Sequence, residues 1–184
     1  MRHKFLAFAA VGALAVSGLG MRAAHAFMGA ENLLQPGTAA PEFTLPSQSD
    51  KAVSLKDFRG KYVVLYFYPK DQTPGCSLEA HNFERDKAKY AAANAVVLGV
   101  SLDSVESHKT FCTKDGLNFK LLSDPEHKVV DSYGVAVMTT PFGKLARRDT
   151  FLISPEGKIL RVWEVTGVEK HSEEVLDAIA DAKK

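Results

Sequence analysis

Long apolar runs alternate with amphipathic stretches along most of the chain. The runs Lys61–Tyr68 and Ala95–Ser101 are rich in β-branched and aromatic residues, which is typical of strands buried on both faces. Pro155-Glu156-Gly157 separates two further apolar runs and predicts a hairpin there. The pattern predicts strands over Ala52–Leu55, Lys61–Tyr68, Ala95–Ser101, Phe119–Leu122, Thr150–Ser154 and Lys158–Val165.

Apolar residues at helical spacing predict a helix after each of the two long strands. The first helix begins near Cys76 and continues to about Tyr90. The second opens at Asp103, where Glu106 stands three residues later as in a capping box. We expect that second helix to end near Gly116, since glycine is the usual residue just past a helix end.

Two more helices complete the order of elements. One is expected to begin after Asp124, with Pro125 at its first helical position. The other, His171–Lys183, is amphipathic, with Val175 and Ile179 facing inward. Strands that alternate with helices and end in a hairpin predict an α/β fold with a central mixed sheet and helices on both faces. Phe27–Pro46 is rich in Pro, Gly, Ala and Thr and predicts an irregular N-terminal extension.

The first 26 residues predict a segment that is not part of this fold. Arg2 and Lys4 precede the apolar run Phe5–Leu19, and Ala24-His25-Ala26 places small residues where signal peptidase cleaves. The alternative is an uncleaved membrane anchor, but an apolar run of about 15 residues is shorter than the roughly 20 that span a bilayer. We therefore expect cleavage after Ala26 and a single exported domain over residues 27–184.

Composition narrows the classes of function. The chain is 46% hydrophobic and 24% charged, with 23 basic and 22 acidic residues, as in an ordinary soluble globular protein. Without a basic excess, nothing predicts nucleic-acid binding. The two cysteines exclude a disulfide-rich scaffold and a four-cysteine zinc site. In an exported compartment, however, two cysteines can be oxidised.

Cys76 is the residue with the clearest chemistry. A buried strand leads into the loop Pro69–Gly75, and that loop places Cys76 at the start of a helix. There the free N–H groups and the helix dipole favour a thiolate. A helix end contributes only about 0.3–1 kcal/mol, whereas a free thiol is only about 3% ionised at pH 7. A nearby cation is therefore needed, and the candidates are Lys70, Arg147 and Arg148.

The segment around this cysteine resembles a known family. PKDQTPGC, residues 69–76, matches the P-x-x-x-[ST]-x-x-C pattern of peroxiredoxins, and the longer string YFYPKDQTPGCSLEA is similar to the Q-type (bacterioferritin comigratory protein) subfamily. The agreement continues at residues 101–108, 122–124, 133–135 and 148–153 and spans about 36–180. The resemblance implies a thioredoxin-like fold and thiol-dependent reduction of hydrogen peroxide or organic hydroperoxides, with no cofactor.

The resemblance also implies roles for individual residues. Cys76 would be the peroxidatic cysteine, whose thiolate attacks the O–O bond and becomes a sulfenic acid. Thr73 would hold the peroxide and the thiolate through its hydroxyl, and Pro69 would shield the sulfur from water. The backbone N–H groups of Gly75 and Cys76 would contact the peroxide.

Two further roles concern the cation beside the sulfur. Arg148, which precedes the sequence TFLI, would supply the positive charge, although its neighbour Arg147 is an alternative assignment. Glu79 would orient Arg148. Donors fixed around the developing charge on the departing oxygen lower the barrier to such a reaction.

The chain departs from many Q-type members at one position. They carry a second cysteine five residues after the first, where this chain has His81. Other members place the resolving cysteine in the next helix, and Cys112 fits that version, so a labile Cys76–Cys112 disulfide is expected. The alternative for Cys112 is a space-filling core residue, and pairing with His108 as a metal site lacks a third ligand.

The remaining candidates are expected to have structural roles only. Thr140-Pro141 is expected to be an ordinary trans loop, and Lys144–Arg148 a solvated basic loop. Phe142 and Trp163 are expected to be packing residues, and His81 a solvated helix residue.

Three functions compete at this point. The first is an exported, periplasmic, monomeric peroxidase that is recycled by a thioredoxin-like or other thiol donor and has no lasting membrane association. The second is a thiol–disulfide oxidoreductase, but Cys76–Glu79 lacks the C-x-x-C pattern. The third is a non-catalytic thioredoxin-like binding module, against which Pro69, Thr73, Cys76 and Arg148 argue together.

Overall fold

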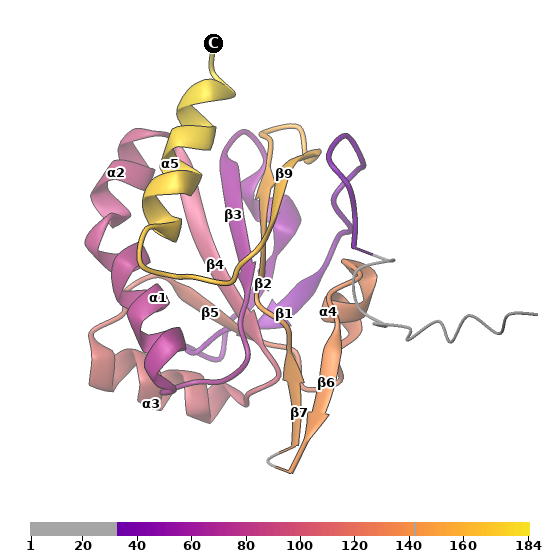
Figure 1. Cartoon of the computed structure of the whole chain (residues 1–184), viewed down its shortest axis with the longest axis vertical. Coiled ribbons are helices and arrows are strands. Elements are labelled where there is room, and N and C mark those ends of the chain that lie inside the picture. Colours follow the sequence, from indigo (N-terminus) through magenta and orange to yellow (C-terminus); the bar gives the residue numbers. More distant parts are fainter. Residues whose placement is uncertain (1–32, 142) are drawn as a thin grey trace, which may run out of the picture.

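A five-stranded mixed sheet forms the centre of the molecule (Figure 1). The computed structural model describes residues 33–141 and 143–184. The strands lie in the order β5-β4-β3-β8-β9, with β3, β4 and β5 parallel and β8 and β9 antiparallel to their neighbours. Their bounds are β3 Tyr62–Phe67, β4 Ala95–Ser101, β5 Lys120–Ser123, β8 Asp149–Ile153 and β9 Ile159–Glu164.

Both faces of this sheet are covered, and this explains the unbroken apolar runs. In β3, Val64 and Tyr66 point into one buried cluster, while Val63, Leu65 and Phe67 point into the other. The first cluster lies under α1 Pro74–Arg85, α2 Lys87–Ala92, α3 Val105–Asp115 and α5 His171–Asp181. The second lies under α4 Lys128–Ser132, the small sheet of β1 Thr44–Pro46 and β2 Ala52–Ser54, and the 3-10 helix η1 Leu55–Phe58.

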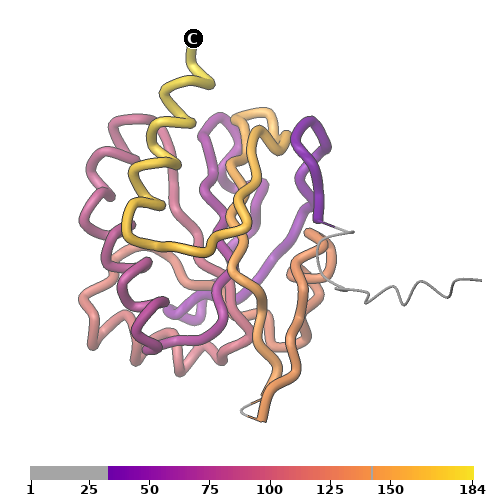
Figure 2. The backbone as a smooth tube through the Cα atoms, in the orientation of Figure 1, coloured from indigo at the N-terminus to yellow at the C-terminus, as the bar shows by residue number. Residues whose placement is uncertain are grey.

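The backbone path makes these layers easy to follow (Figure 2). α1, α2 and α5 lie together on one side of the sheet, while α4 lies on the other side with the N-terminal strands. The prediction of a mixed sheet with helices on both faces is therefore confirmed. The hairpin between β8 and β9 is confirmed as well: Ser154 N donates to Lys158 O at 2.7 Å, and Gly157 takes the positive φ of 85° that its turn requires.

The first predicted helix differs from the structure at both ends. It begins at Pro74 rather than Cys76, and it stops at Asp86, after which α2 runs separately. The Asp86 side chain is buried and accepts hydrogen bonds from Arg85, Lys89 and Ser172. Ser172 belongs to α5, and the backbone of Asp86 leaves the helical conformation, with φ −92° and ψ 4°. Hydrophobic periodicity along the sequence does not reveal this break.

The predicted starts of two other helices are also wrong. α3 is capped by Ser104, whose side chain accepts from Ser107 N at 3.2 Å, and not by Asp103. α4 begins at Lys128, so Pro125 lies in the preceding turn. Asp124 still serves this helix, since its carboxylate accepts from the N–H groups of residues 128–130 at 2.9–3.1 Å.

Two segments expected to be irregular contain strands. β1 lies inside the N-terminal stretch that was expected to have no regular structure. β6 Val137–Thr140 and β7 Gly143–Ala146 pair as a two-stranded antiparallel sheet, which extends away from the body of the fold (Figures 1 and 2). The Thr140–Pro141 bond at its tip is trans, as expected. Phe142 lies outside the described residues, as does the predicted signal segment.

None of the described helices is long and apolar enough to cross a membrane. The predicted domain begins at residue 27, and the part of it that the structure describes, from Leu33 on, contains the central sheet and all the elements named above.

Candidate active site

Cys76 lies in the first turn of α1 and is 2% exposed. Thr73 caps the helix with an extended backbone, and Pro74 occupies the first helical position, where a missing N–H costs nothing. The helix can begin abruptly here because the loop leaves β3 at Phe67 and turns through Gln72, whose φ is 57°. The sulfur is therefore placed where backbone N–H groups lack helical partners.

A guanidinium lies against this sulfur. Arg148 Nη2 donates to Cys76 Sγ at 3.2 Å, and the Arg148 side chain is 16% exposed. Arg148 directly precedes β8, and Asp149 pairs with Phe67 of β3. Antiparallel pairing of β3 and β8 thus brings an arginine 72 residues away in sequence to the loop that carries the cysteine.

Glu79 holds the other side of that guanidinium. It follows Cys76 by almost one helical turn, is 1% exposed, and accepts through Oε2 from Arg148 Nη1. Burial raises the pKa of Glu79 to about 7, although Arg148 opposes this shift. Burial acts against the charge of Arg148, but Glu79 and Cys76 outweigh burial and raise its pKa. The thiol, guanidinium and carboxyl form one chain of contacts.

The other residues named by the resemblance lie around the same loop. Pro69 and Thr73 are partly buried, and the Thr73 hydroxyl donates to Lys70 O at 3.0 Å. Gly75 adjoins the guanidinium closely, since a Cβ there would lie 3.6 Å from Arg148 Nη2.

Only one of the three candidate cations contacts the sulfur. Arg147 turns to Asp149 and Glu164, at 2.9 Å from each. Lys70 lies 3.6 Å from Asp103. The prediction of a solvated loop over Lys144–Arg148 is wrong. Its first three residues belong to β7, and the side chains of Arg147 and Arg148, which lead into β8, are largely buried.

Cys112 lies in the C-terminal half of α3 and is 9% exposed. Its side chain belongs to the same buried cluster as Cys76, but both thiols are free and no disulfide joins them. Burial and the carboxylates of Asp71, Glu84 and Asp115 raise the pKa of Cys112 to about 12. The two cysteines therefore have opposite electrostatic surroundings.

The histidines and Trp163 have structural partners. His81 is exposed and pairs with Asp115 of α3 at 3.2 Å, not with Cys76. His108 is fully buried and faces Asp71. Trp163 packs edge-on against His171, with ring centroids 5.8 Å apart. Within residues 33–141 and 143–184, no group of three or more metal-ligating side chains forms a metal site.

The sequence did not lead us to Asp71, a buried residue of the loop with several hydrogen bonds. Asp71 belongs to the loop, and its side chain is buried in a polar network that reaches α3. The signal was present: an aspartate and a histidine both fall in the segments that resemble the peroxiredoxins. When buried, both residue types need hydrogen-bond partners, and each can serve the other.

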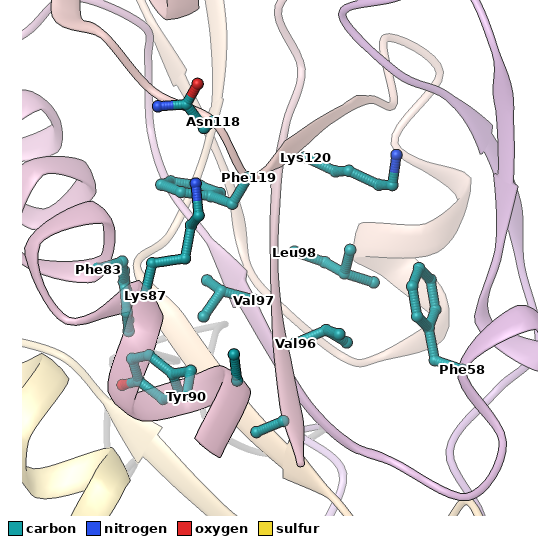
Figure 3. Close-up of a pocket in the computed structure, with 12 residues that line it drawn as sticks. Phe58, Phe83, Lys87, Tyr90, Val96, Val97, Leu98, Asn118, Phe119 and Lys120 are labelled. Carbon is teal, nitrogen blue, oxygen red and sulfur yellow. The ribbon is translucent and has the colours of Figure 1, made fainter. Parts of the chain in front are cut away.

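An apolar cavity of about 250 Å³ lies apart from the sulfur (Figure 3). It lies between α2 and the start of β4, and its lining includes Phe83, Tyr90, Val97 and Phe119. None of Cys76, Arg148 and Glu79 lines it. The reactive groups therefore lie outside this cavity.

This arrangement defines a cysteine-based redox enzyme: a thioredoxin-like sheet presents one thiol at a helix start against an arginine. The AhpC/TSA family model matches residues 36–162. Peroxiredoxin Bcp of Bacillus subtilis is 41% identical over 151 residues, 80% of this chain and 96% of that protein. The chain therefore belongs to the AhpC/TSA family and is a peroxiredoxin of the Bcp/Q type, a thiol-dependent peroxidase.

Solved structures agree with this assignment. A cysteine-to-serine mutant of Xylella fastidiosa PrxQ matches with a TM-score of 0.76 at 34% identity, over 82% of this chain and 98% of that one. The bacterioferritin comigratory protein of Xanthomonas campestris matches with a TM-score of 0.72 at 33% identity, over 83% of this chain and 98% of that one. Its structures give insight into its alkyl peroxide reduction activity. The predicted family, thioredoxin-like fold and peroxidase activity are confirmed.

Proposed function

We propose that Cys76 is the nucleophile of this peroxidase. The observation that carries the assignment is the 3.2 Å hydrogen bond from Arg148 Nη2 to Cys76 Sγ at the start of α1. The thiolate attacks one oxygen of the peroxide, the O–O bond breaks, and Cys76 becomes a sulfenic acid. The departing oxygen takes a proton and leaves as water or as an alcohol.

Arg148 stabilises negative charge on the sulfur and then on the departing oxygen, as donors fixed around a developing charge do. Glu79 acts through Arg148 and holds it in place, supported by their contact. Thr73 and the N–H groups of Gly75 and Cys76 bind the peroxide, and Pro69 keeps water from the sulfur. Hydrogen peroxide and alkyl hydroperoxides are the substrates; the alkyl peroxide reduction activity of the Xanthomonas campestris protein supports the second class.

Cys112 resolves the sulfenic acid. Its thiolate attacks Cys76 Sγ, an S–S bond forms, and the hydroxyl leaves as water with the proton that Cys112 has lost. The sequence separation supports this: two Xanthomonas campestris peroxiredoxin Q structures are serine mutants of cysteines separated by the same number of residues as Cys76 and Cys112. An external thioredoxin-like dithiol then reduces the disulfide.

The decisive experiment compares Cys76→Ser and Cys112→Ser. Reduced protein is mixed with stoichiometric hydrogen peroxide in a stopped-flow instrument, and the products are identified by mass spectrometry. We expect no thiol oxidation in Cys76→Ser and a persistent sulfenic acid at Cys76 in Cys112→Ser. Oxidation of Cys112 in the Cys76→Ser variant at the wild-type rate would overturn the assignment.

The protein acts outside the cytoplasm, as a monomer in the periplasm. The cationic start, the apolar run and the A-x-A sequence ending at Ala26 support export. The intact mass of the protein recovered from a periplasmic extract tests this, with Phe27 expected as the first residue. Recovery of the full chain in the membrane fraction would identify an uncleaved anchor instead, and light scattering checks the oligomeric state.

A further inference from the structure

A buried polar cluster lies beneath the loop that carries Cys76. Its centre is the carboxylate of Asp71, whose side chain is 2% exposed. Tyr68 donates to Asp71 Oδ1 at 2.7 Å, and Ser107 donates to Oδ2 at 2.7 Å. His108 Nδ1 lies 2.9 and 3.1 Å from the two oxygens. Because an ionised carboxylate only accepts, Nδ1 carries a proton and donates.

This cluster joins the loop that carries Cys76 to α3. Asp71 belongs to the loop before α1, whereas Ser107 and His108 belong to the N-terminal half of α3. The backbone adds a second tie, since Asp71 N donates to Asp103 Oδ2 at 2.9 Å. Both the side chain and the main chain of Asp71 are thereby bound to α3 or to the residues that lead into it.

The carboxylate is charged and depends on all its donors. Burial opposes its ionisation, but the hydrogen bonds from His108, Ser107 and Tyr68 outweigh burial and hold the pKa of Asp71 below its usual value. A buried carboxylate that loses a donor keeps its desolvation cost without the compensation. Opening α3 away from the loop removes two of the donors at once.

The position of Cys112 makes this opening relevant to the reaction. Cys112 follows His108 by one helical turn, and both cysteines are buried on folded helices without a bond between them. A disulfide requires Cα atoms within about 7 Å and suitably directed side chains. The bond can therefore form only in a conformation that brings the two Cα atoms this close.

The contacts at the other end of α3 are weaker. His81 pairs with Asp115 at 3.2 Å, and Lys114 reaches Gln72 at 3.4 Å. His81, Lys114 and Gln72 are exposed, and exposed pairs contribute little to stability. The buried Asp71 cluster is the stronger tie between α3 and the loop.

We propose that Asp71 is a positioning residue that clamps α3 to the active-site loop, and that release of this clamp controls how fast Cys112 reaches Cys76. The proposal rests on the resolving role of Cys112 given above. While the clamp holds, α3 stays folded and the sulfenic acid persists. When the hydrogen bonds from Ser107 and His108 break, α3 opens and the disulfide forms.

The test uses Ser107→Ala, which removes one donor from the carboxylate, with Thr110→Ala as the matched control. Thr110 lies on the same helix and donates only to Glu106 O, within α3 itself. Amide hydrogen exchange is measured on the reduced full-length protein, and stopped-flow separates sulfenic acid formation from disulfide formation. For Ser107→Ala we expect exchange in α3 and disulfide formation to be about tenfold faster, as for the loss of one hydrogen bond to a charge.

In Ser107→Ala the rate of sulfenic acid formation stays within about threefold of wild type, and Thr110→Ala changes none of the three rates. His108→Asn is the second variant that weakens the cluster. Ser107→Ala and His108→Asn should each raise the peroxide concentration at which Cys76 is over-oxidised. Unchanged or slower exchange and disulfide formation in both variants would overturn the clamp. If the wild type forms no Cys76–Cys112 bond, the resolving role fails, whereas exchange in the reduced protein still decides whether Asp71 holds α3.

Discussion

The two cysteines of this chain are buried to a similar degree but have opposite surroundings. Cys76 is 2% exposed at the start of α1 and accepts a hydrogen bond from Arg148 at 3.2 Å. Cys112 is 9% exposed in the C-terminal half of α3. Around Cys112 the charges are carboxylates, which together with burial raise the pKa of its thiol to about 12.

The comparison shows that burial alone does not decide what a thiol can do. Burial disfavours a thiolate, and a donor or cation fixed beside the sulfur opposes that effect. Cys76 has both a helix start and a guanidinium. Cys112 has neither, since it lies inside α3 and the charges around it are carboxylates.

The largest expected difference between the two regions is in alkylation. With iodoacetamide at pH 7, we expect native Cys76 to react at least on the order of 10³-fold faster than Cys112, because a thiol with a pKa near 12 is almost never ionised. Peptide mass spectrometry over time measures both rates. In urea the two rates should converge; equal rates in the native protein would show that the surroundings of the two sulfurs do not set their reactivity.

Removing the guanidinium should make Cys76 resemble Cys112. We expect Arg148→Met to slow peroxide oxidation of Cys76 about 10²- to 10³-fold, the usual cost of losing one donor at a developing charge. Arg148→Lys keeps the charge and should lose less. Lys70→Met is the control, because Lys70 lies in the same loop as Thr73 but contacts Asp103 and not the sulfur. A similar loss in Lys70→Met would mean that general positive charge, and not this contact, activates the sulfur.

Protonation of Glu79, the partner of Arg148, should make the stability of the protein depend on pH. The folded-state pKa of Glu79, about 7, lies above the ordinary value of 4.5, so the folded protein binds this proton more tightly than the unfolded chain does. The resulting stability is fully present below pH 4.5 and is lost as the pH rises through 7. Glutamine does not titrate, so Glu79→Gln does not lose this stability. We therefore expect the free energy of unfolding of Glu79→Gln minus that of the wild type to rise by on the order of 3 kcal/mol between pH 4.5 and pH 7.

Urea unfolding of both proteins at several pH values measures this difference. A pH-independent difference would show that Glu79 remains ionised in the folded protein throughout the range.

The smallest expected effect is that of added volume beside the sulfur. At Gly75 a Cβ would lie 3.6 Å from Arg148 Nη2, an ordinary contact, so Gly75→Ala should change the rate of Cys76 oxidation by less than about threefold. Gly99→Ala is the contrasting variant, because its Cβ would lie 2.7 Å from Leu121 and Tyr66. It should cost about 1–3 kcal/mol of stability. A large rate loss in Gly75→Ala would show that space, as well as charge, limits the site.

Local patterns predicted those parts of the fold that depend on local forces. The bounds of β3 and β4 followed from unbroken runs of β-branched and aromatic residues, and Gly116 does end α3, with a φ of 68°. The break at Asp86 and the β6–β7 hairpin were missed. The first depends on contacts such as that with Ser172, far away in the sequence, and the second on a strand pairing that periodicity did not mark.

The sequence alone determined that Cys76 follows a buried strand and a proline-containing loop at a helix start, because strand, turn and helix preferences act between near neighbours. Only the tertiary structure decided which cation lies beside the sulfur. Arg147 and Arg148 are adjacent, and side chains alternate between the faces of an extended segment. The pairing of Phe67 with Asp149 directs one to Cys76 and leaves the other with Asp149 and Glu164. A register that joins residues so far apart depends on how the whole sheet packs, which no local pattern contains.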